Sequence, residues 1–210
     1  MLTGLAARAS LWNRRRKLAL FMQTINPGPE TRVVDVGVGD TPFGTEPGVA
    51  ATHNFFEALY PWPEQITAVS DVPLRTFAEA FPAISTVVAD GLELPFADDE
   101  FDVAFSNAVV EHVGGRGEQR RFVAELCRVA PRVFVSTPNK WFPVETHTLV
   151  PLVHWLPRDA ADHTMRMLRR KEWDQIELLG KQELLALFPA NVRAHAVEAR
   201  ITVSVVAERA

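Results

Sequence analysis

The sequence has a single cysteine, Cys127, among its 210 residues. One thiol excludes an internal disulfide and a zinc site built from cysteines, and nothing points to an oxidising compartment. The chain also has no apolar run long enough to cross a bilayer, so a membrane partner is not expected. The arginines at 14–16 follow its first apolar residues, whereas those of a signal peptide precede them. We therefore expect a cytoplasmic protein.

The sequence also has no excess of basic residues. There are 22 lysines and arginines against 26 aspartates and glutamates, which gives a formal net charge of −4. Nonspecific binding to nucleic acid needs a basic surface, so a nucleic-acid partner is not expected. Internal repeats and low-complexity tracts are also lacking. At this length, with 47% hydrophobic and 23% charged residues, we expect one domain over residues 1–210 with a sizeable core.

The most informative stretch covers residues 33–40, Val-Val-Asp-Val-Gly-Val-Gly-Asp. Its β-branched residues predict a short buried strand. The strand ends in Asp-x-Gly-x-Gly, where glycine permits backbone angles closed to other residues and lets the main chain approach a ligand. In an α/β sheet, such a loop commonly binds an adenosine-bearing cofactor. A glycine-rich turn without a ligand fits the motif alone equally well.

Predicted strands and helices alternate along the chain. The expected helices cover residues 6–25, 49–60, 74–81, 118–129 and 181–188, with a helical start at 108–112. The expected strands that follow the first cover residues 66–70, 85–89, 101–105, 132–137 and a closing hairpin at 192–197 and 201–207. This alternation predicts an α/β fold, with a mostly parallel sheet covered by helices on both faces.

Three segments lie outside this alternation. Residues 1–28 are expected to form an N-terminal helical extension. Its basic cluster permits a membrane-surface or phosphate-binding helix, but a lid packed on the domain, with its basic side solvated, is favoured. Residues 41–65 form an insertion after the glycine loop, and residues 138–180 form another after the fifth strand.

A dinucleotide site is not expected. That site requires G-x-G-x-x-G and an acidic residue about twenty positions later. Pro42 occupies the third glycine position, and the acid after the next strand, Asp71, comes too late. Pro42 would also remove an N–H from the helix start that should hold the pyrophosphate.

Four motifs at successive strand ends together resemble the class I S-adenosylmethionine-dependent methyltransferases, in their small-molecule branch. They are Asp35-x-Gly37-x-Gly39, Ser70-Asp71, Asp90-Gly91-Leu92 before Leu94-Pro95-Phe96, and the run FDVAFSNAVVEHV at 101–113. The resemblance covers residues 31–137. It implies a Rossmann-like, seven-stranded, mostly parallel sheet with an antiparallel C-terminal hairpin, and S-adenosyl-L-methionine as the cofactor.

The resemblance also implies which residues bind this cofactor. The amino acid end would lie on the first loop, with Asp35 facing its ammonium beside Gly37, Gly39 and Asp40. The adenine would lie against Asp90, Gly91 and Leu92, and Asn107 would close over the methionine portion.

The sequence departs from the family's pattern at two positions, one in the glycine loop and one where the ribose would bind. Thr41 stands where the family usually has a third glycine, and Ser70 stands where it has the acid that binds the ribose. Asp71 follows one position later. It reaches the ribose if the strand ends in a bulge, and it is otherwise a turn or capping residue.

Methyl transfer requires alignment of the nucleophile with the donor, and a base if the acceptor is a hydroxyl. His112 is the first candidate base, because its position after the fourth strand faces the acceptor side. A helix-start or core histidine is the alternative. Residues 138–163 combine aromatic and polar side chains, which suits a sugar or another hydroxylated ring. Tyr60 and Trp62 could join the same wall, or all these aromatic residues could be core.

Glu145 and His147 are the other candidate catalytic residues. With His163 they could instead hold a divalent ion such as Mg²⁺ that polarises an acceptor hydroxyl, although the sequence fixes none of their distances. The sequence thus predicts an O-methyltransferase that acts on a small hydroxylated acceptor, preferably a saccharide. N- or C-methylation of another small metabolite, or S-adenosylmethionine binding without catalysis, are the alternatives. The oligomeric state is open, a homodimer included.

Overall fold

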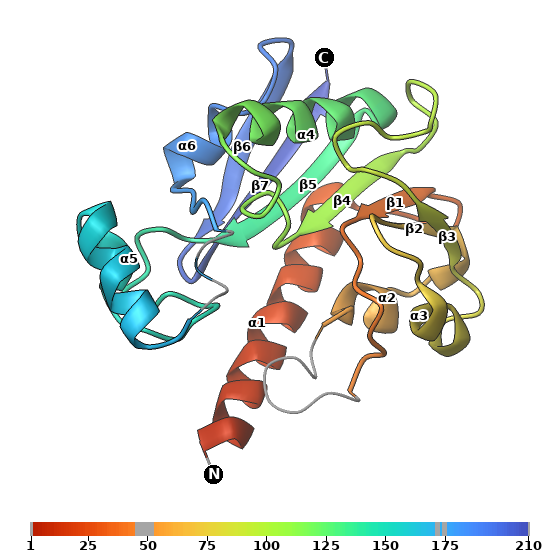
Figure 1. Cartoon of the computed structure of the whole chain (residues 1–210). Coiled ribbons are helices and arrows are strands. Elements are labelled where there is room, and N and C mark those ends of the chain that lie inside the picture. Colours follow the sequence, from red (N-terminus) through yellow and green to blue (C-terminus); the bar gives the residue numbers. More distant parts are fainter. Residues whose placement is uncertain (1, 45–52, 171–172, 174–175, 210) are drawn as a thin grey trace.

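The computed structural model describes residues 2–44, 53–170, 173 and 176–209. Within these residues a seven-stranded sheet has the order β3-β2-β1-β4-β5-β7-β6 (Figure 1). Its strands are β1 (Val33–Val36), β2 (Ile66–Ser70), β3 (Ser85–Val88), β4 (Val103–Asn107), β5 (Arg132–Pro138), β6 (Val192–Ala199) and β7 (Thr202–Arg209). Strands β1 to β5 are parallel, and β7 runs antiparallel to both β5 and β6. The predicted sheet, with its antiparallel hairpin, is confirmed.

The described helices follow the predicted alternation. They are α1 (Leu2–Ile25), α2 (Phe55–Leu59), α3 (Arg75–Ala80), α4 (Arg116–Val129), α5 (Arg158–Met167) and α6 (Lys181–Leu185), with short 3₁₀ turns η2 (Pro63–Gln65) and η3 (Val153–Trp155). The helix predicted over residues 49–60 is described only as α2. Its residues 49–52, like 45–52 of the predicted 41–65 insertion, lie outside the described residues.

The helical start predicted at residues 108–112 is wrong. Ala108 adopts a left-handed conformation with φ 59°, and its amide still pairs with the Ser136 carbonyl of β5 at 2.7 Å. The chain then makes a turn closed by the His112 amide, which donates to the Val109 carbonyl at 2.8 Å. This turn, rather than a helix, carries Glu111 and His112 past the end of β4.

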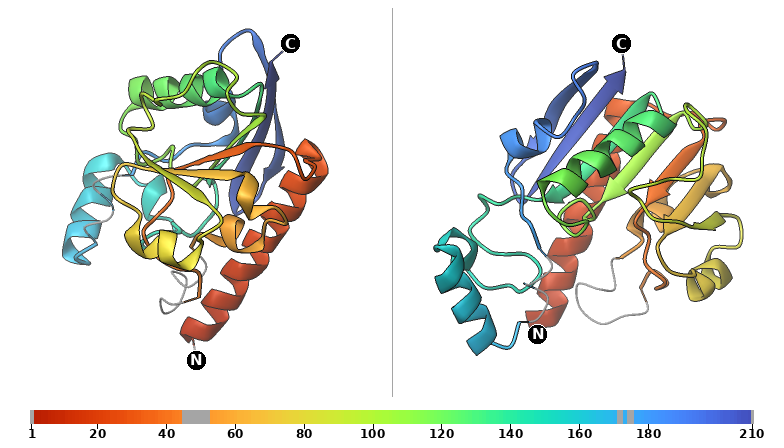
Figure 2. Two further views of the ribbon diagram at one scale, coloured as in Figure 1. Left: turned by 90° about the vertical axis from the view of Figure 1, so that its right-hand side faces the viewer. Right: turned by 45° about the horizontal axis from the view of Figure 1, so that its top comes forward.

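Helices cover both faces of the sheet because neighbouring strand residues point to opposite faces. Val34 and Val36 of β1 pack with Phe122 and Leu126 of α4 on one face. On the other face Val33 packs with a cluster that α1, α2 and α3 contribute, including Phe21, Phe56 and Phe77. Two further views show α4 and α1 on opposite sides of the sheet (Figure 2). No helix of the described chain has the length and hydropathy that a membrane crossing requires.

The segment after β5 departs from the alternation. It contains η3 and α5, which share a small cluster of Val153, Ala161, Met165 and Trp173. The segment projects from the sheet near the N-terminal half of α1 (Figures 1 and 2). The sequence predicts no helix here, because only Ala161 and Met165 of α5 are buried and its apolar spacing is correspondingly sparse.

Candidate active site

A cavity of about 350 Å³ opens at the carboxyl ends of the parallel strands. Strand β1 lies between β2 and β4, so this is the topological switch point where open α/β sheets bind ligands. Most of the residues predicted to bind the cofactor line the cavity, namely Gly37, Ser70, Asp71, Asp90, Gly91 and Leu92. His112, predicted as a catalytic base, lines it as well.

Gly37 shapes the loop after β1. Its φ is +98°, and an added Cβ would lie only 2.2 Å from Cγ2 of Val109. The amides of Gly37 and Val38 both donate to the Val69 carbonyl, at 2.9 and 3.0 Å, which holds the loop against the end of β2. Only glycine combines this backbone conformation with so close an approach of the turn after β4.

Two acidic side chains, those of Asp71 and Asp90, line the cavity after the ends of β2 and β3. Asp90 accepts a hydrogen bond from the Leu92 amide at 2.8 Å through Oδ1, which fixes the turn after β3. Ser70 is buried, whereas Asp71 is exposed, and both line the cavity. Asp71 therefore lines the cavity although it lies one position after the family's usual acid. Ser70, at the usual position, lines the cavity as well.

Gly39 and Asp40 do not line this cavity. Oδ1 of Asp40 accepts a hydrogen bond from the Phe77 amide at 2.8 Å, in the first turn of α3. The Gly39 carbonyl accepts from Nδ2 of Asn54 at 2.8 Å. Both residues thus fasten the glycine loop to the elements that follow it.

Asp35 and Asn107 line a smaller neighbouring pocket together with Glu57 of α2. The buried carboxyl groups of Asp35 and Glu57 are hydrogen-bonded to each other. Burial, with the nearby Glu57 charge, holds the pKa of Asp35 well above its usual value. Burial also raises the pKa of Glu57, to about 7, although hydrogen bonds and Arg14 act in the opposite direction. The carboxyl predicted to face the cofactor's ammonium therefore shares a proton with Glu57.

Lys17 of helix α1 contacts Asn107, a residue that lines this pocket, and is only 4% exposed. Its ammonium nitrogen donates a hydrogen bond to Oδ1 of Asn107 at the end of β4. Burial, aided by the nearby charge of Arg14, lowers the pKa of Lys17 to about 7 against the opposing charges of Glu111 and Glu198. One residue of the basic cluster is thus a buried part of the site rather than a solvated charge.

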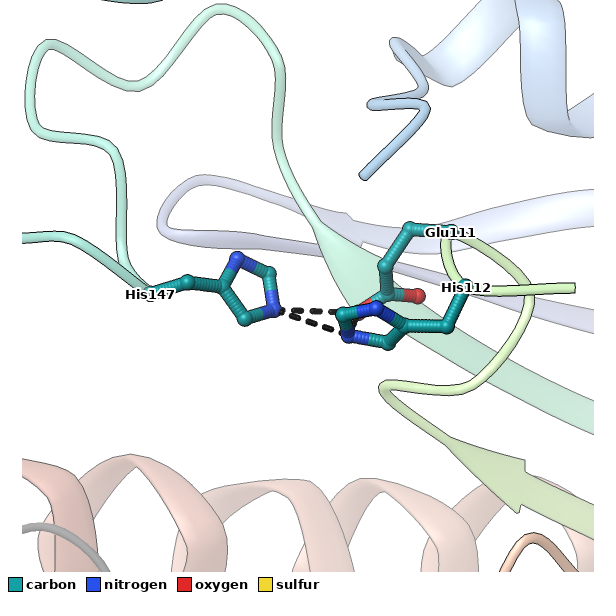
Figure 3. Close-up of side chains that lie close together, drawn as sticks. All are labelled: Glu111, His112 and His147. Atoms are coloured by element: carbon teal, nitrogen blue, oxygen red, sulfur yellow. Dashed lines mark hydrogen bonds and ion pairs between the residues drawn. The ribbon is translucent and has the colours of Figure 1, made fainter. Parts of the chain in front are cut away.

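Glu111, His112 and His147 form a cluster beside the cavity (Figure 3). The two Nε2 atoms of His112 and His147 lie 3.2 Å apart. Oε1 of Glu111 lies 3.7 Å from Nε2 of His147 and 4.0 Å from Nε2 of His112. Glu111 is fully buried. Its Oε2 accepts from the Thr137 hydroxyl at 2.8 Å, but its Oε1 has no hydrogen-bond partner within the described part of the chain.

Glu145 holds His147 in place. Its Oε1 lies 2.7 Å from Nδ1 of His147, and its Oε2 accepts from the amide and hydroxyl of Thr148, each at 2.6 Å. Burial opposes the charged form of Glu145, but these hydrogen bonds outweigh it and lower its pKa to about 2. Burial likewise disfavours the charged form of His147, but interactions with Glu111 and Glu145 raise its pKa to about 9.

The structure thus brings together His112, His147 and Glu145, the three candidate catalytic residues. It does not bring together the predicted metal set, because His163 lies on α5 outside the cluster and Glu145 is saturated by Thr148 and His147. Glu111, Glu57 and Lys17 were missed as site residues. A signal existed only for Glu111, which directly precedes His112 in the fourth motif.

The aromatic residues proposed for the acceptor wall divide into two groups. Tyr60 is buried in the core beside Phe21 and Phe56, and Trp62 packs against the same cluster. Trp141 and Trp155 are 64% and 45% exposed. They belong to the same segment as His147.

Residues 48–132 match the family described as "Methyltransferase domain". A comparison with curated proteins gives no match. Among solved structures, the YcgJ protein from Bacillus subtilis is 17% identical with a TM-score of 0.58, over 88% of this chain and 71% of that one.

Two further structures have names that state an activity. A Thermotoga maritima protein described as a "SAM-dependent methyltransferase, possible histamine N-methyltransferase" is 15% identical with a TM-score of 0.57, over 92% of this chain and 89% of that one. The N-methyltransferase NodS from Bradyrhizobium japonicum, in complex with S-adenosyl-L-homocysteine, is 14% identical with a TM-score of 0.56, over 93% and 86%. At these identities the likeness concerns the fold, whereas the domain match concerns the family. The domain match and the shared fold together support a class I S-adenosylmethionine-dependent methyltransferase.

Proposed function

We propose that this methyltransferase transfers a methyl group to a hydroxyl of a small acceptor, with a saccharide as the preferred class. One observation carries the proposal: His112 lines the donor cavity and its Nε2 lies 3.2 Å from Nε2 of His147. An imidazole pair therefore borders the space in which an acceptor would meet the donor. Hydroxyl methylation needs such a group, because the proton must leave the oxygen as the new bond forms.

The cavity suits the donor by shape and by polarity. Asp71 or Ser70 would bind the ribose hydroxyls, and Asp90, Gly91 and Leu92 the adenine. Gly37 has no side chain that would keep the amino acid end of the donor from the main chain, and Gly39 and Asp40 follow it in the same loop. Asp35 and Asn107 would lie beside this end of the donor. When bound, S-adenosylmethionine supplies a methyl group already activated by its sulfonium.

His112 is the proposed base. Glu145 accepts the Nδ1 proton of His147, which turns the Nε2 of His147 toward His112. The carboxylate of Glu111, with Oε1 4.0 Å from Nε2 of His112, would balance the positive charge that His112 gains with the proton. General base catalysis of this kind typically contributes a factor of about 10²–10⁴ to the rate.

The preference for a saccharide rests on the segment that carries His147. Trp141 and Trp155 expose flat aromatic surface, and such surface next to polar groups fits a ring that bears hydroxyls. An acidic net charge of −4 favours a small molecule over a nucleic acid. The N-methyltransferase names of two structural neighbours support N-methylation of a small metabolite as the second candidate.

The test is a screen of the purified protein with S-adenosylmethionine against sugars, nucleotide sugars, phenols and amines. Formation of S-adenosylhomocysteine is measured by mass spectrometry, and the methylated atom is located by NMR. His147→Asn should lower kcat about 100-fold and leave the affinity for S-adenosylhomocysteine within a factor of about three.

His195→Asn, an exposed position on the edge strand β6, is the control and should behave as wild type. Methylation of amines alone, or full activity in His147→Asn, would contradict the proposal. Donor binding without turnover of any acceptor would instead indicate a binding protein.

A further inference from the structure

We propose that Glu111, His112 and His147 bind one divalent metal ion of the borderline class, of which Zn²⁺ is representative. The three residues come from two segments, the turn after β4 and the loop after β5. Their side chains converge on one point from different directions (Figure 3). The ion would have two imidazole nitrogens and one carboxylate oxygen as its protein ligands.

The spacing of the three donor atoms fits such an ion without rearrangement. The sides of the triangle that they form measure 3.2, 3.7 and 4.0 Å. The point equidistant from three atoms so spaced lies about 2.1 Å from each, which is the bond length of zinc to imidazole nitrogen and carboxylate oxygen. A small contraction of the triangle would lift the ion out of its plane toward a tetrahedral geometry.

The hydrogen bonds around the cluster direct lone pairs at this point. Because Nδ1 of His147 faces Glu145 at 2.7 Å, Nε2 lies on the opposite side of the ring, and its lone pair would bind the ion once the Nε2 proton is displaced. Thr137 occupies Oε2 of Glu111 and leaves Oε1 turned toward the imidazoles. A carboxylate behind a ligating histidine is the usual outer-shell arrangement of protein metal sites.

Glu111 supplies an independent indication. Its side chain is fully buried, and Oε1 accepts no hydrogen bond from any residue that the structure describes. A buried carboxylate oxygen without a hydrogen bond is costly, and the nearest polar atoms to it in this cluster are the two Nε2 atoms. A cation between the three atoms would compensate its charge. Imidazole donors favour zinc and its neighbours over Mg²⁺, which prefers oxygen ligands.

Three protein ligands leave a coordination position open, as in catalytic rather than structural zinc sites. Since His112 also lines the donor cavity, that position faces the space proposed for the acceptor. The role of the ion rests on the proposed function. An acceptor hydroxyl bound to the ion would lose its proton to bulk water more readily. Its oxygen would then form the O–CH₃ bond as the C–S bond of the donor breaks and S-adenosylhomocysteine leaves. With the ion bound, His112 acts as a ligand instead of a base.

The test is direct metal binding by the tag-free protein after removal of metal with EDTA. Zn²⁺ is titrated by calorimetry and Co²⁺ by its visible absorption, which reports the coordination geometry of the bound ion. We expect one equivalent of either ion to bind. Glu111→Gln and His147→Asn should weaken binding at least 100-fold, and Glu145→Gln about 10- to 100-fold. His195→Asn is the matched control and should bind as wild type, and binding of S-adenosylhomocysteine verifies that each variant is folded.

Failure of either ion to bind while S-adenosylhomocysteine still binds would overturn the inference, as would equal affinity in Glu111→Gln and wild type. These results are independent of methyl transfer. A protein that binds the ion but methylates no hydroxyl leaves the metal site standing and rejects the proposed function. A protein that methylates a hydroxyl, is indifferent to EDTA and binds no ion rejects the metal site alone.

Discussion

Lys17 of helix α1 donates a hydrogen bond to Asn107, the last residue of strand β4 and 90 positions along the chain. The N-terminal helix is thereby joined to the sheet at the edge where the donor cavity opens. Phe21, one helical turn after Lys17, is fully buried and contacts Phe105 of the same strand with 5.5 Å between ring centroids. Helix α1 is thus packed against β4 next to the site, and Lys17 is its polar contact with the end of that strand.

The burial of Lys17 predicts a pH dependence of stability. Its pKa is lowered to about 7 in the folded protein, whereas an unfolded lysine has a pKa near 10.4. Between these values the unfolded chain binds more protons, so the contribution of Lys17 to stability rises with pH. Lys17→Met removes this contribution. The free energy of unfolding of Lys17→Met minus that of wild type should therefore fall, by roughly 3–5 kcal/mol, between about pH 7 and pH 10. Urea unfolding of both proteins measures it, and a difference that is constant with pH would refute it.

The Asp35–Glu57 pair predicts the opposite pH dependence of stability, a loss of stability with rising pH, in a lower pH range. The pKa of Glu57 is raised to about 7, above the value of about 4.3 in an unfolded chain. The stability from its bound proton is fully present below the unfolded pKa and is lost as the pH rises through the folded pKa. Wild type should therefore lose a few kcal/mol relative to Glu57→Gln between about pH 4 and pH 7. Glu64→Gln, an exposed position on η2, is the control and should follow wild type, and an equal slope in Glu57→Gln would count against a shared proton.

The two glycines of the loop should differ sharply on substitution. Gly37→Ala places a side chain at φ +98° and 2.2 Å from Val109, so we expect a loss of at least 1–3 kcal/mol, roughly the strain of such a conformation. Binding of S-adenosylhomocysteine should weaken at least tenfold. Gly39→Ala meets only Oγ1 of Thr41, at an ordinary 3.7 Å, and should change the stability by less than about 1 kcal/mol. Denaturant unfolding and calorimetry test both, and equal losses in the two variants would be the contrary result.

Asp71 and Asp40 should separate binding from stability. Asp71 lines the donor cavity, so Asp71→Ala should weaken binding of S-adenosylhomocysteine about tenfold or more and leave the melting temperature nearly unchanged. Asp40 accepts the Phe77 amide in the first turn of α3, so Asp40→Ala should destabilise the fold by about 1 kcal/mol, as loss of a capping residue does. Calorimetry and thermal unfolding of both variants measure the contrast. Reversed effects would show that Asp40, and not Asp71, is the ligand of the donor.

The sheet, and the strand ends that line the cavity, could be predicted from the sequence alone. Apolar strands that end in glycine or acidic residues fix the order of elements and put Gly37, Asp71 and Asp90 at one edge, because parallel strands share the direction in which they end. These signals are local, since each lies within a few residues of its strand. Helix α5 was not predicted, because little of its surface is buried and its apolar residues are therefore sparse.

Only the tertiary structure decided which polar groups meet. The pairs Lys17–Asn107 and Asp35–Glu57 join residues that are distant in the sequence, and Glu111 meets His147 across the ends of β4 and β5. Sequence patterns record burial and turns, which depend on neighbours along the chain. The distances between side chains, and with them the shifted pKa values and the convergence of lone pairs on one point, depend on how the loops after the strands turn, and no local pattern encodes that.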